Sequence, residues 1–71
     1  MKEKILKEIK LRKENIRYYC LKVEALRKKL NSYFDEEKEK INFIISIIKD
    51  YNEIIDENKT KIQKLESEIN G

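Results

Sequence analysis

The chain has 71 residues, of which 44% are charged, with a net charge of +3, no proline, no histidine, one cysteine and a single glycine at position 71. We expect one domain over residues 1–71, because a chain of this size buries only about 60% of its unfolded surface. Because the chain has no proline and its one glycine is at position 71, turn-rich β folds and phosphate-binding glycine loops are excluded. The lack of His excludes the usual zinc sites and His-based catalysis.

Apolar residues recur at spacings of three and four from residue 5 to residue 30, which predicts a helix over about residues 2–31. In heptad notation the a positions are Ile9, Ile16, Val23 and Leu30, and the d positions are Ile5, Arg12, Tyr19 and Leu26. Arg12 interrupts this apolar seam. It either fixes the register of the packing, as buried polar residues do in coiled coils, or lies in water near an open end.

A break in the apolar pattern predicts a turn over about residues 31–36. If the first frame continued, it would place Glu37 and Lys40 in the core. Asn31 can take a left-handed conformation that ends a helix, and Ser32 with Asp35 fits a helix N-terminal cap. Cations before the break and anions after it suit a helix end and a helix start: Arg27, Lys28 and Lys29, then Asp35, Glu36 and Glu37.

A second heptad pattern predicts a helix over about residues 36–69. Its a positions are all isoleucine, at Ile41, Ile48, Ile55, Ile62 and Ile69. Asn58 lies at a d position, and we expect water to reach it near the open end of the molecule.

The two patterns fit one antiparallel register, so we predict an all-α fold, an antiparallel two-helix coiled-coil hairpin. The a–d pairs across the hairpin, such as Val23 with Ile44 and Tyr19 with Ile48, have residue numbers that add to 67. Residues 1–34 carry 11 basic and 4 acidic residues (net +7), whereas residues 35–71 carry 6 basic and 10 acidic residues (net −4). Two helices of opposite charge attract each other when they lie side by side. The alternative is one continuous helix of about 105 Å with a stutter near the predicted turn.

Both helices carry apolar residues outside the seam, more than a two-stranded coiled coil needs. Residues 41–48 are apolar on nearly every side, which is typical of a helix covered from more than one direction. We therefore predict that two hairpins dimerise into a four-helix bundle. The alternative is that another protein covers this surface. The predicted protein-interface residues are Tyr18, Leu21, Phe43, Ile45, Ile47 and Ile54.

These features favour a non-enzymatic interaction protein of the cytoplasm, acting by helix packing as an assembly factor, adaptor or inhibitor, possibly one encoded by a mobile element. Cys20 has no His to activate it, so we expect a small core residue rather than a nucleophile. One cysteine makes no internal disulfide, which is typical of an intracellular chain. We expect no cofactor and no metal, and no membrane partner, because no apolar stretch approaches the roughly 20 residues of a span.

The basic residues of the first helix give a second interpretation, nucleic-acid binding. Lys10, Lys13 and Arg17 are able to contact phosphates. Acidic residues interleave with them along the same segment, so we favour a solvated basic face over a nucleic-acid site.

The segment Ser46–Asp50 gives a third interpretation. Ser46 and Asp50 match the ends of the Ser-Gln-Glu-Leu-Asp motif on the second helix of small sporulation phosphatases, and Leu26–Leu30 is similar to the end of their first helix. The resemblance implies a two-helix hairpin that removes phosphate from the aspartate of a response regulator. Ile47 and Ile48 stand where that family has a polar pair.

Overall fold

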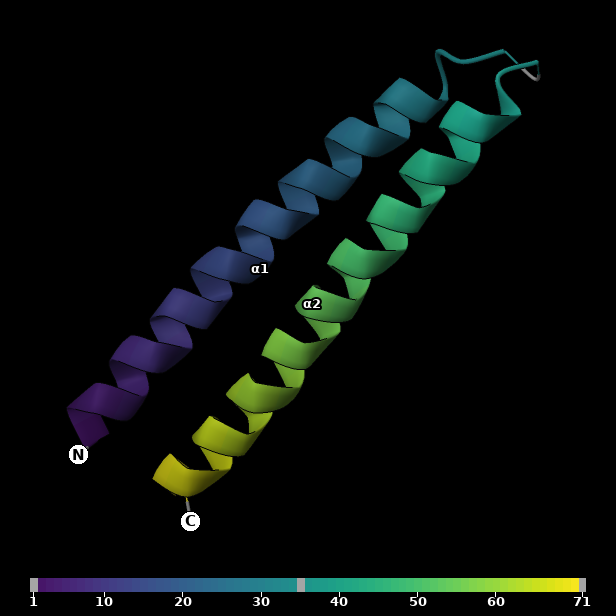
Figure 1. Ribbon diagram of the computed structural model, residues 1–71. Coiled ribbons are helices and arrows are strands. Elements are labelled where there is room, and N and C mark those ends of the chain that lie inside the picture. Colours follow the sequence, from purple (N-terminus) through teal and green to yellow (C-terminus); the bar gives the residue numbers. More distant parts are fainter. Residues whose placement is uncertain (1, 35, 71) are drawn as a thin grey trace.

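The computed structural model describes residues 2–34 and 36–70, which form two α-helices and a connecting segment (Figure 1). Helix α1 spans Lys2–Leu30 and helix α2 spans Lys38–Asn70. They lie antiparallel and side by side, so the start of α1 and the end of α2 share one end of the molecule. The Cα atoms extend over 54 × 14 × 12 Å. The all-α helical hairpin is therefore confirmed, and the continuous helix of about 105 Å is wrong.

The end of α1 is closed by its own last turn. The backbone N–H of Asn31 donates to the carbonyl of Arg27 at 3.2 Å, and the hydroxyl of Ser32 donates to the carbonyl of Lys29 at 2.6 Å. Ser32 therefore satisfies a carbonyl at the end of α1. The prediction that it caps α2 is wrong. Among the described residues no non-glycine residue has a positive φ, so the left-handed conformation predicted for Asn31 is wrong.

Helix α2 begins two residues later than predicted. The backbone N–H of Ile41 donates to the carbonyl of Glu37 at 3.0 Å, which makes Glu37 the residue that precedes the first helical position. The connection thus runs from residue 31 to residue 37 and is one residue longer than predicted. Asp35, which completed the predicted cap, lies outside the described residues.

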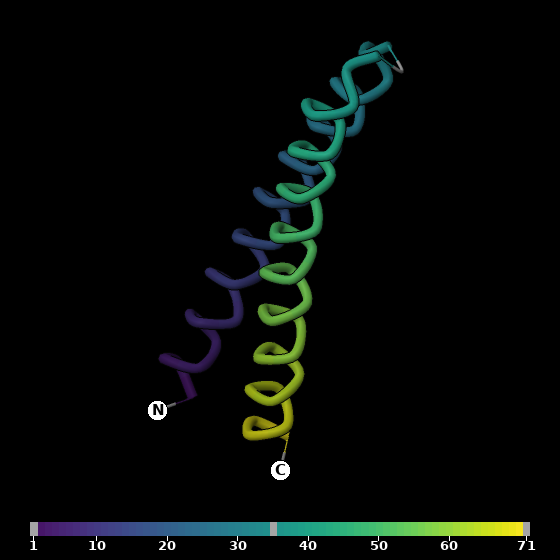
Figure 2. The backbone as a smooth tube through the Cα atoms, turned by 45° about the vertical axis from the view of Figure 1, so that its right-hand side comes forward, coloured from purple at the N-terminus to yellow at the C-terminus, as the bar shows by residue number. Residues whose placement is uncertain are grey.

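The core is the seam of a and d positions, and it is densest toward the turn. Its buried cluster consists of Val23, Ile44, Ile48 and Ile55. Half-buried side chains of both helices surround that cluster, namely Ile16, Tyr19, Leu26, Leu30, Tyr33 and Tyr51. Figure 2 shows that the helices are inclined to each other, as in a coiled coil. The seam therefore accounts for the pairing of α1 with α2.

Two contacts across the seam define the register. The ring centroid of Tyr19 lies 5.3 Å from that of Tyr51, one turn beyond its predicted neighbour Ile48. Arg12 Nη1 donates to Asn58 Oδ1 at 3.0 Å, one turn beyond its predicted neighbour Ile55. In the predicted alignment, each of these contacts joins residues of two adjoining layers of the seam. The paired residues therefore lie diagonally across the seam from each other.

Candidate interaction surfaces

The six predicted interface residues differ in exposure. Phe43 is 66% exposed and Ile45 50% exposed, and Tyr18 and Leu21 are also exposed. Ile47 and Ile54 are half-buried beside the seam. A hairpin of two helices covers only its a and d positions, which leaves the extra apolar residues in contact with water.

The six residues do not share one face. Ile45 and Ile47 are two positions apart on α2, which separates them by about 200° around the helix axis. Phe43, Ile47 and Ile54 follow each other at spacings of four and seven, so they share one side of α2. Ile45 lies on the opposite flank of the hairpin.

Residues of α1 extend the side that Phe43 occupies. In an antiparallel pair the g positions of the two helices meet on one flank and the e positions on the other. Tyr18 and Leu11 occupy c positions next to g, which places them on the flank of Ile47 and Ile54. Leu21 occupies an f position, on the outer side of α1. We call the shared surface the Phe43 face, made of Leu11, Tyr18, Phe43, Ile47 and Ile54.

Leu11 is the member of the Phe43 face that the predicted interface lacks. Its side chain is as exposed as that of Leu21. The signal that identifies it is its spacing, because it precedes Tyr18 by seven residues and therefore occupies the same position of the heptad.

Aromatic side chains connect α1 to α2 on this flank. The rings of Tyr18 and Tyr19 meet edge to face, with centroids 5.4 Å apart and an interplanar angle of 79°. Tyr19 in turn contacts Tyr51 of α2. The Lys22 ammonium lies 5.3 Å from the centroid of the Tyr18 ring, a cation–π contact. Tyr18 is therefore held in place by its neighbours although it is exposed.

A polar pair interrupts the seam. Asn58 is only 7% exposed, so the prediction that water reaches it is wrong. The long side chain of Arg12 crosses from α1 and covers it, and Asn58 Nδ2 donates to the carbonyl of Ile54 at 3.0 Å. Arg12 also donates to Glu8 Oε1, at 2.9 Å from Nη2. The pair separates the main buried cluster from Ile9 and Ile62, which are buried toward the open end.

Cys20 is exposed, so the core position predicted for it is wrong. It lies at an e position, on the flank opposite the Phe43 face. Packing against a single partner helix does not enclose that position.

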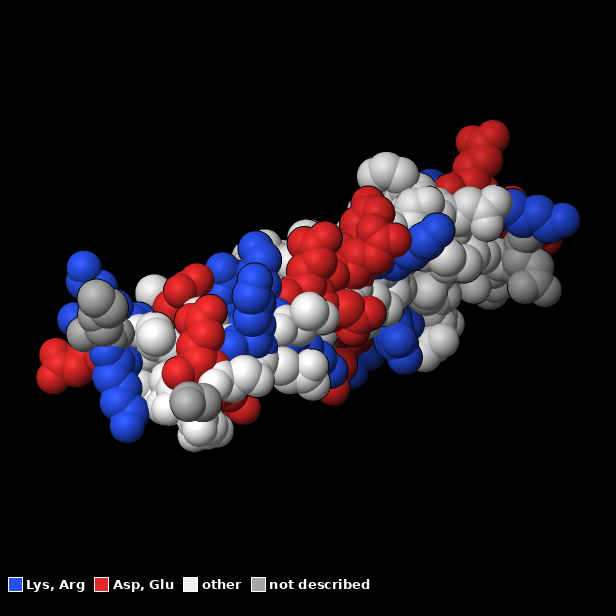
Figure 3. Space-filling view, turned by 90° about the horizontal axis from the view of Figure 1, so that it is seen from below, with Lys and Arg blue, Asp and Glu red and all other residues white. Residues whose placement is uncertain are grey.

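The basic residues predicted as nucleic-acid contacts are all exposed. Lys10, Lys13 and Arg17 are spaced by three and four, so they form one strip along α1. The ion pairs found among the described residues are Arg12 with Glu8 and Lys40 with Glu37, and neither involves this strip. Figure 3 shows basic and acidic side chains alternating over the face in view, with uncharged atoms most extensive toward the turn.

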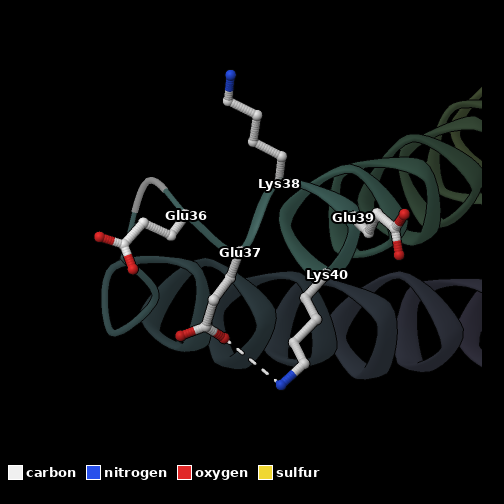
Figure 4. Close-up of a pocket in the computed structure, with 5 residues that line it drawn as sticks. All are labelled: Glu36, Glu37, Lys38, Glu39 and Lys40. Atoms are coloured by element: carbon white, nitrogen blue, oxygen red, sulfur yellow. Dashed lines mark ion pairs between the residues drawn. The ribbon is translucent and has the colours of Figure 1, made fainter.

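The pockets on the hairpin are shallow. One of about 300 Å³ is lined by residues 36–40 at the start of α2. Their charged ends point in different directions, and only Lys40 and Glu37 approach each other, at 3.5 Å (Figure 4). Another, of about 240 Å³, lies between the helix ends beside Leu6, Ile9 and Ile69. The first pocket is lined by acidic and basic side chains alone, and the second by both apolar and polar ones.

Ser46 and Asp50 lie one turn apart and are both exposed. Between them, Ile48 is buried in the core and Ile47 is half-buried, so the positions that are polar in the phosphatase motif here support packing. The phosphatase activity stays a prediction.

Comparisons of the chain with protein-family models, curated proteins and solved structures give no match. Within residues 2–34 and 36–70, neither helix has the length and apolar character to cross a membrane. In the same part of the chain no group of His, Cys, Asp and Glu side chains is placed to hold a metal ion. The apolar Phe43 face and the basic strip are the candidate binding surfaces of the hairpin.

Proposed function

We propose that the chain is a cytoplasmic protein-interaction module that acts by helix packing, as an assembly factor, an adaptor or an inhibitor. The observation that supports this function is the Phe43 face, where Leu11, Tyr18 and Phe43 are exposed on one flank and Ile47 and Ile54 are half-buried between the helices. Exposed apolar side chains gathered on one flank are typical of sites that bind another protein.

The accessible surface of the hairpin also supports an interaction role. It amounts to 6143 Å², whereas a compact monomer of 8.7 kDa has about 4,700 Å². The excess of about 1,400 Å² exceeds the roughly 800 Å² that each partner buries in a protein interface of standard size. The elongated hairpin therefore has enough surface to give to a partner.

The chemistry of the face suits packing against helices. Phe43 is a large exposed aromatic residue, the type that dominates binding energy when it enters a partner's pocket. Phe43 and Ile47 are four positions apart and so form a ridge along α2, and such ridges fit the grooves between side chains of a facing helix. Recognition of this kind needs no catalytic group.

Site-specific photo-crosslinking tests this function. A photoreactive residue at position 43 should form covalent adducts with protein, in purified solution or in an extract of the source cells. The matched control carries the same residue at position 53, which is exposed on α2 and lies outside the Phe43 face. Equal yields at the two positions, or no protein adduct at either, would contradict the proposal.

Nucleic-acid binding is a second candidate, supported by the exposed strip of Lys10, Lys13 and Arg17. Positive side chains at this spacing are able to contact successive phosphates and to release counterions. Binding to a duplex of random sequence, measured over a series of salt concentrations, tests this role. Absence of binding at low salt would exclude it.

A further inference from the structure

We infer that the occupant of the Phe43 face is a second copy of this chain, with α1 of each copy packed against α2 of the other and both turns at the same end. This inference rests on the proposed function, because it uses the same face. It adds the identity of a partner and a specific geometry.

A closed pair of hairpins joined through one face has two possible symmetry axes. An axis parallel to the helices places α1 on α2 of the second copy and puts both turns at the same end. An axis across the helices, in the plane between the copies, places α1 on α1 and α2 on α2, with the turns at opposite ends. Charge and the placement of the apolar residues distinguish the two.

The charges of the two helices favour the parallel axis. Helix α1 carries 11 basic and 4 acidic residues (net +7), and α2 carries 6 and 7 (net −1). The axis across the helices would bring two helices of net charge +7 together. Packed helices lie about 8–10 Å apart, which is close to the screening length of about 8 Å at physiological salt. Salt therefore weakens this repulsion without removing it, and pairing α1 with α2 avoids it.

The Phe43 face is not centred on the length of α2, and this also favours the parallel axis. Phe43 and Ile47 lie in the half of α2 toward the turn, while the equivalent g and c positions toward its other end are Lys61 and Lys64. With both turns at one end, Phe43 and Ile47 lie at the level of Lys22 and Ala25 of the second copy's α1, so they meet one lysine. With the turns at opposite ends and the hairpins fully overlapped, they would meet two lysines, Lys61 and Lys64.

The parallel axis also pairs the aromatic and aliphatic parts of the face. In the antiparallel register Tyr18 lies at the level of residues 49–52 of its own α2, where its neighbour Tyr19 contacts Tyr51. The symmetry places Tyr18 at that same level against α2 of the second copy. It is then within one turn of the second copy's Ile47. Each Tyr18 thus covers an isoleucine that a single hairpin leaves half-buried.

The first test compares Phe43→Glu with Ile45→Glu. Both residues are at least half exposed, and they lie two positions apart on opposite flanks of α2. Phe43→Glu should raise the dissociation constant of the dimer by about 30-fold or more, the effect of losing a large aromatic contact in an interface. Ile45→Glu should change it little, and helical content measured by circular dichroism should be retained in both. The reverse order of the two effects would overturn the assignment of the face.

The second test measures the geometry. A spin label at Asn31→Cys, in a Cys20→Ser background, lies at the turn and on the surface. Turns at the same end give an inter-copy distance well below the 54 Å length of the hairpin, whereas turns at opposite ends give a distance near that length. A long distance would overturn the arrangement, and a monomeric chain would overturn the self-association. A monomer that still crosslinks to another protein from position 43 would leave the proposed function intact.

Discussion

Replacing Ile48 by alanine tests whether the seam of the hairpin is its core. Ile48 is 8% exposed within the buried cluster and lies on α2 three positions from Ile45, which is 50% exposed on the opposite flank from the Phe43 face. The same substitution at the two sites changes helix propensity equally, so the difference between them reports burial. Ile45→Ala is therefore the matched control.

The structure sets the size of the two effects. Ile→Ala removes three carbon atoms, worth about 2.4 kcal/mol of transfer free energy when fully buried, at about 0.8 kcal/mol each. The cavity left at Ile48 adds to this value, and measured costs in cores reach about 2–5 kcal/mol. At the half-exposed Ile45 about half of the transfer term applies, about 1.2 kcal/mol, and no closed cavity forms.

Thermal unfolding followed by circular dichroism at one protein concentration measures both variants. Because 1 kcal/mol shifts Tm by about 4–8 °C in a domain of this size, Ile48→Ala should lower Tm by roughly 10 °C or more, and Ile45→Ala by clearly less. The concentration is held fixed because self-association makes Tm depend on it. Equal losses at the two sites would refute the packing described for α2.

Three further changes test separate parts of the molecule. Asn58→Ala should reduce the free energy of unfolding by about 1–3 kcal/mol, because it removes a partner of Arg12, and a double-mutant cycle with Arg12→Ala should be non-additive; additive losses would contradict the contact. If nucleic acid binds, Lys10→Glu with Arg17→Glu should weaken binding and flatten its salt dependence; unchanged affinity would remove the strip from that role. If the chain is a phosphatase, Asp50→Ala should abolish phosphate release from a phosphorylated response regulator; an inactive wild-type chain would exclude that activity.

The sequence was sufficient to predict the helices and their pairing, because the seam is periodic in both halves of the chain. The isoleucine column of α2 and the phase change after Leu30 favour a hairpin over one continuous helix without any tertiary information. The boundary was less accurate, since no Gly or Pro marks it. Several charged residues suit a helix start equally well, and the backbone selects Glu37 as the residue before α2.

The environment of single side chains was harder to predict. A polar residue in a seam is buried when a long side chain from the other helix reaches it, and periodicity does not show that Arg12 reaches Asn58. Cys20 was assigned to the core because it adjoins the seam, but two helices do not enclose an e position. The sequence predicts the six interface residues as one set, whereas helical geometry separates Ile45 from Phe43.

The absolute mass of the chain in solution, measured by light scattering on a sizing column over a wide concentration range, tests the account most directly. Self-association through the Phe43 face predicts twice the chain mass of 8.7 kDa for the native sequence and the single-chain mass for Phe43→Glu at low concentration. The mass of a single chain for the native sequence at every concentration would contradict it.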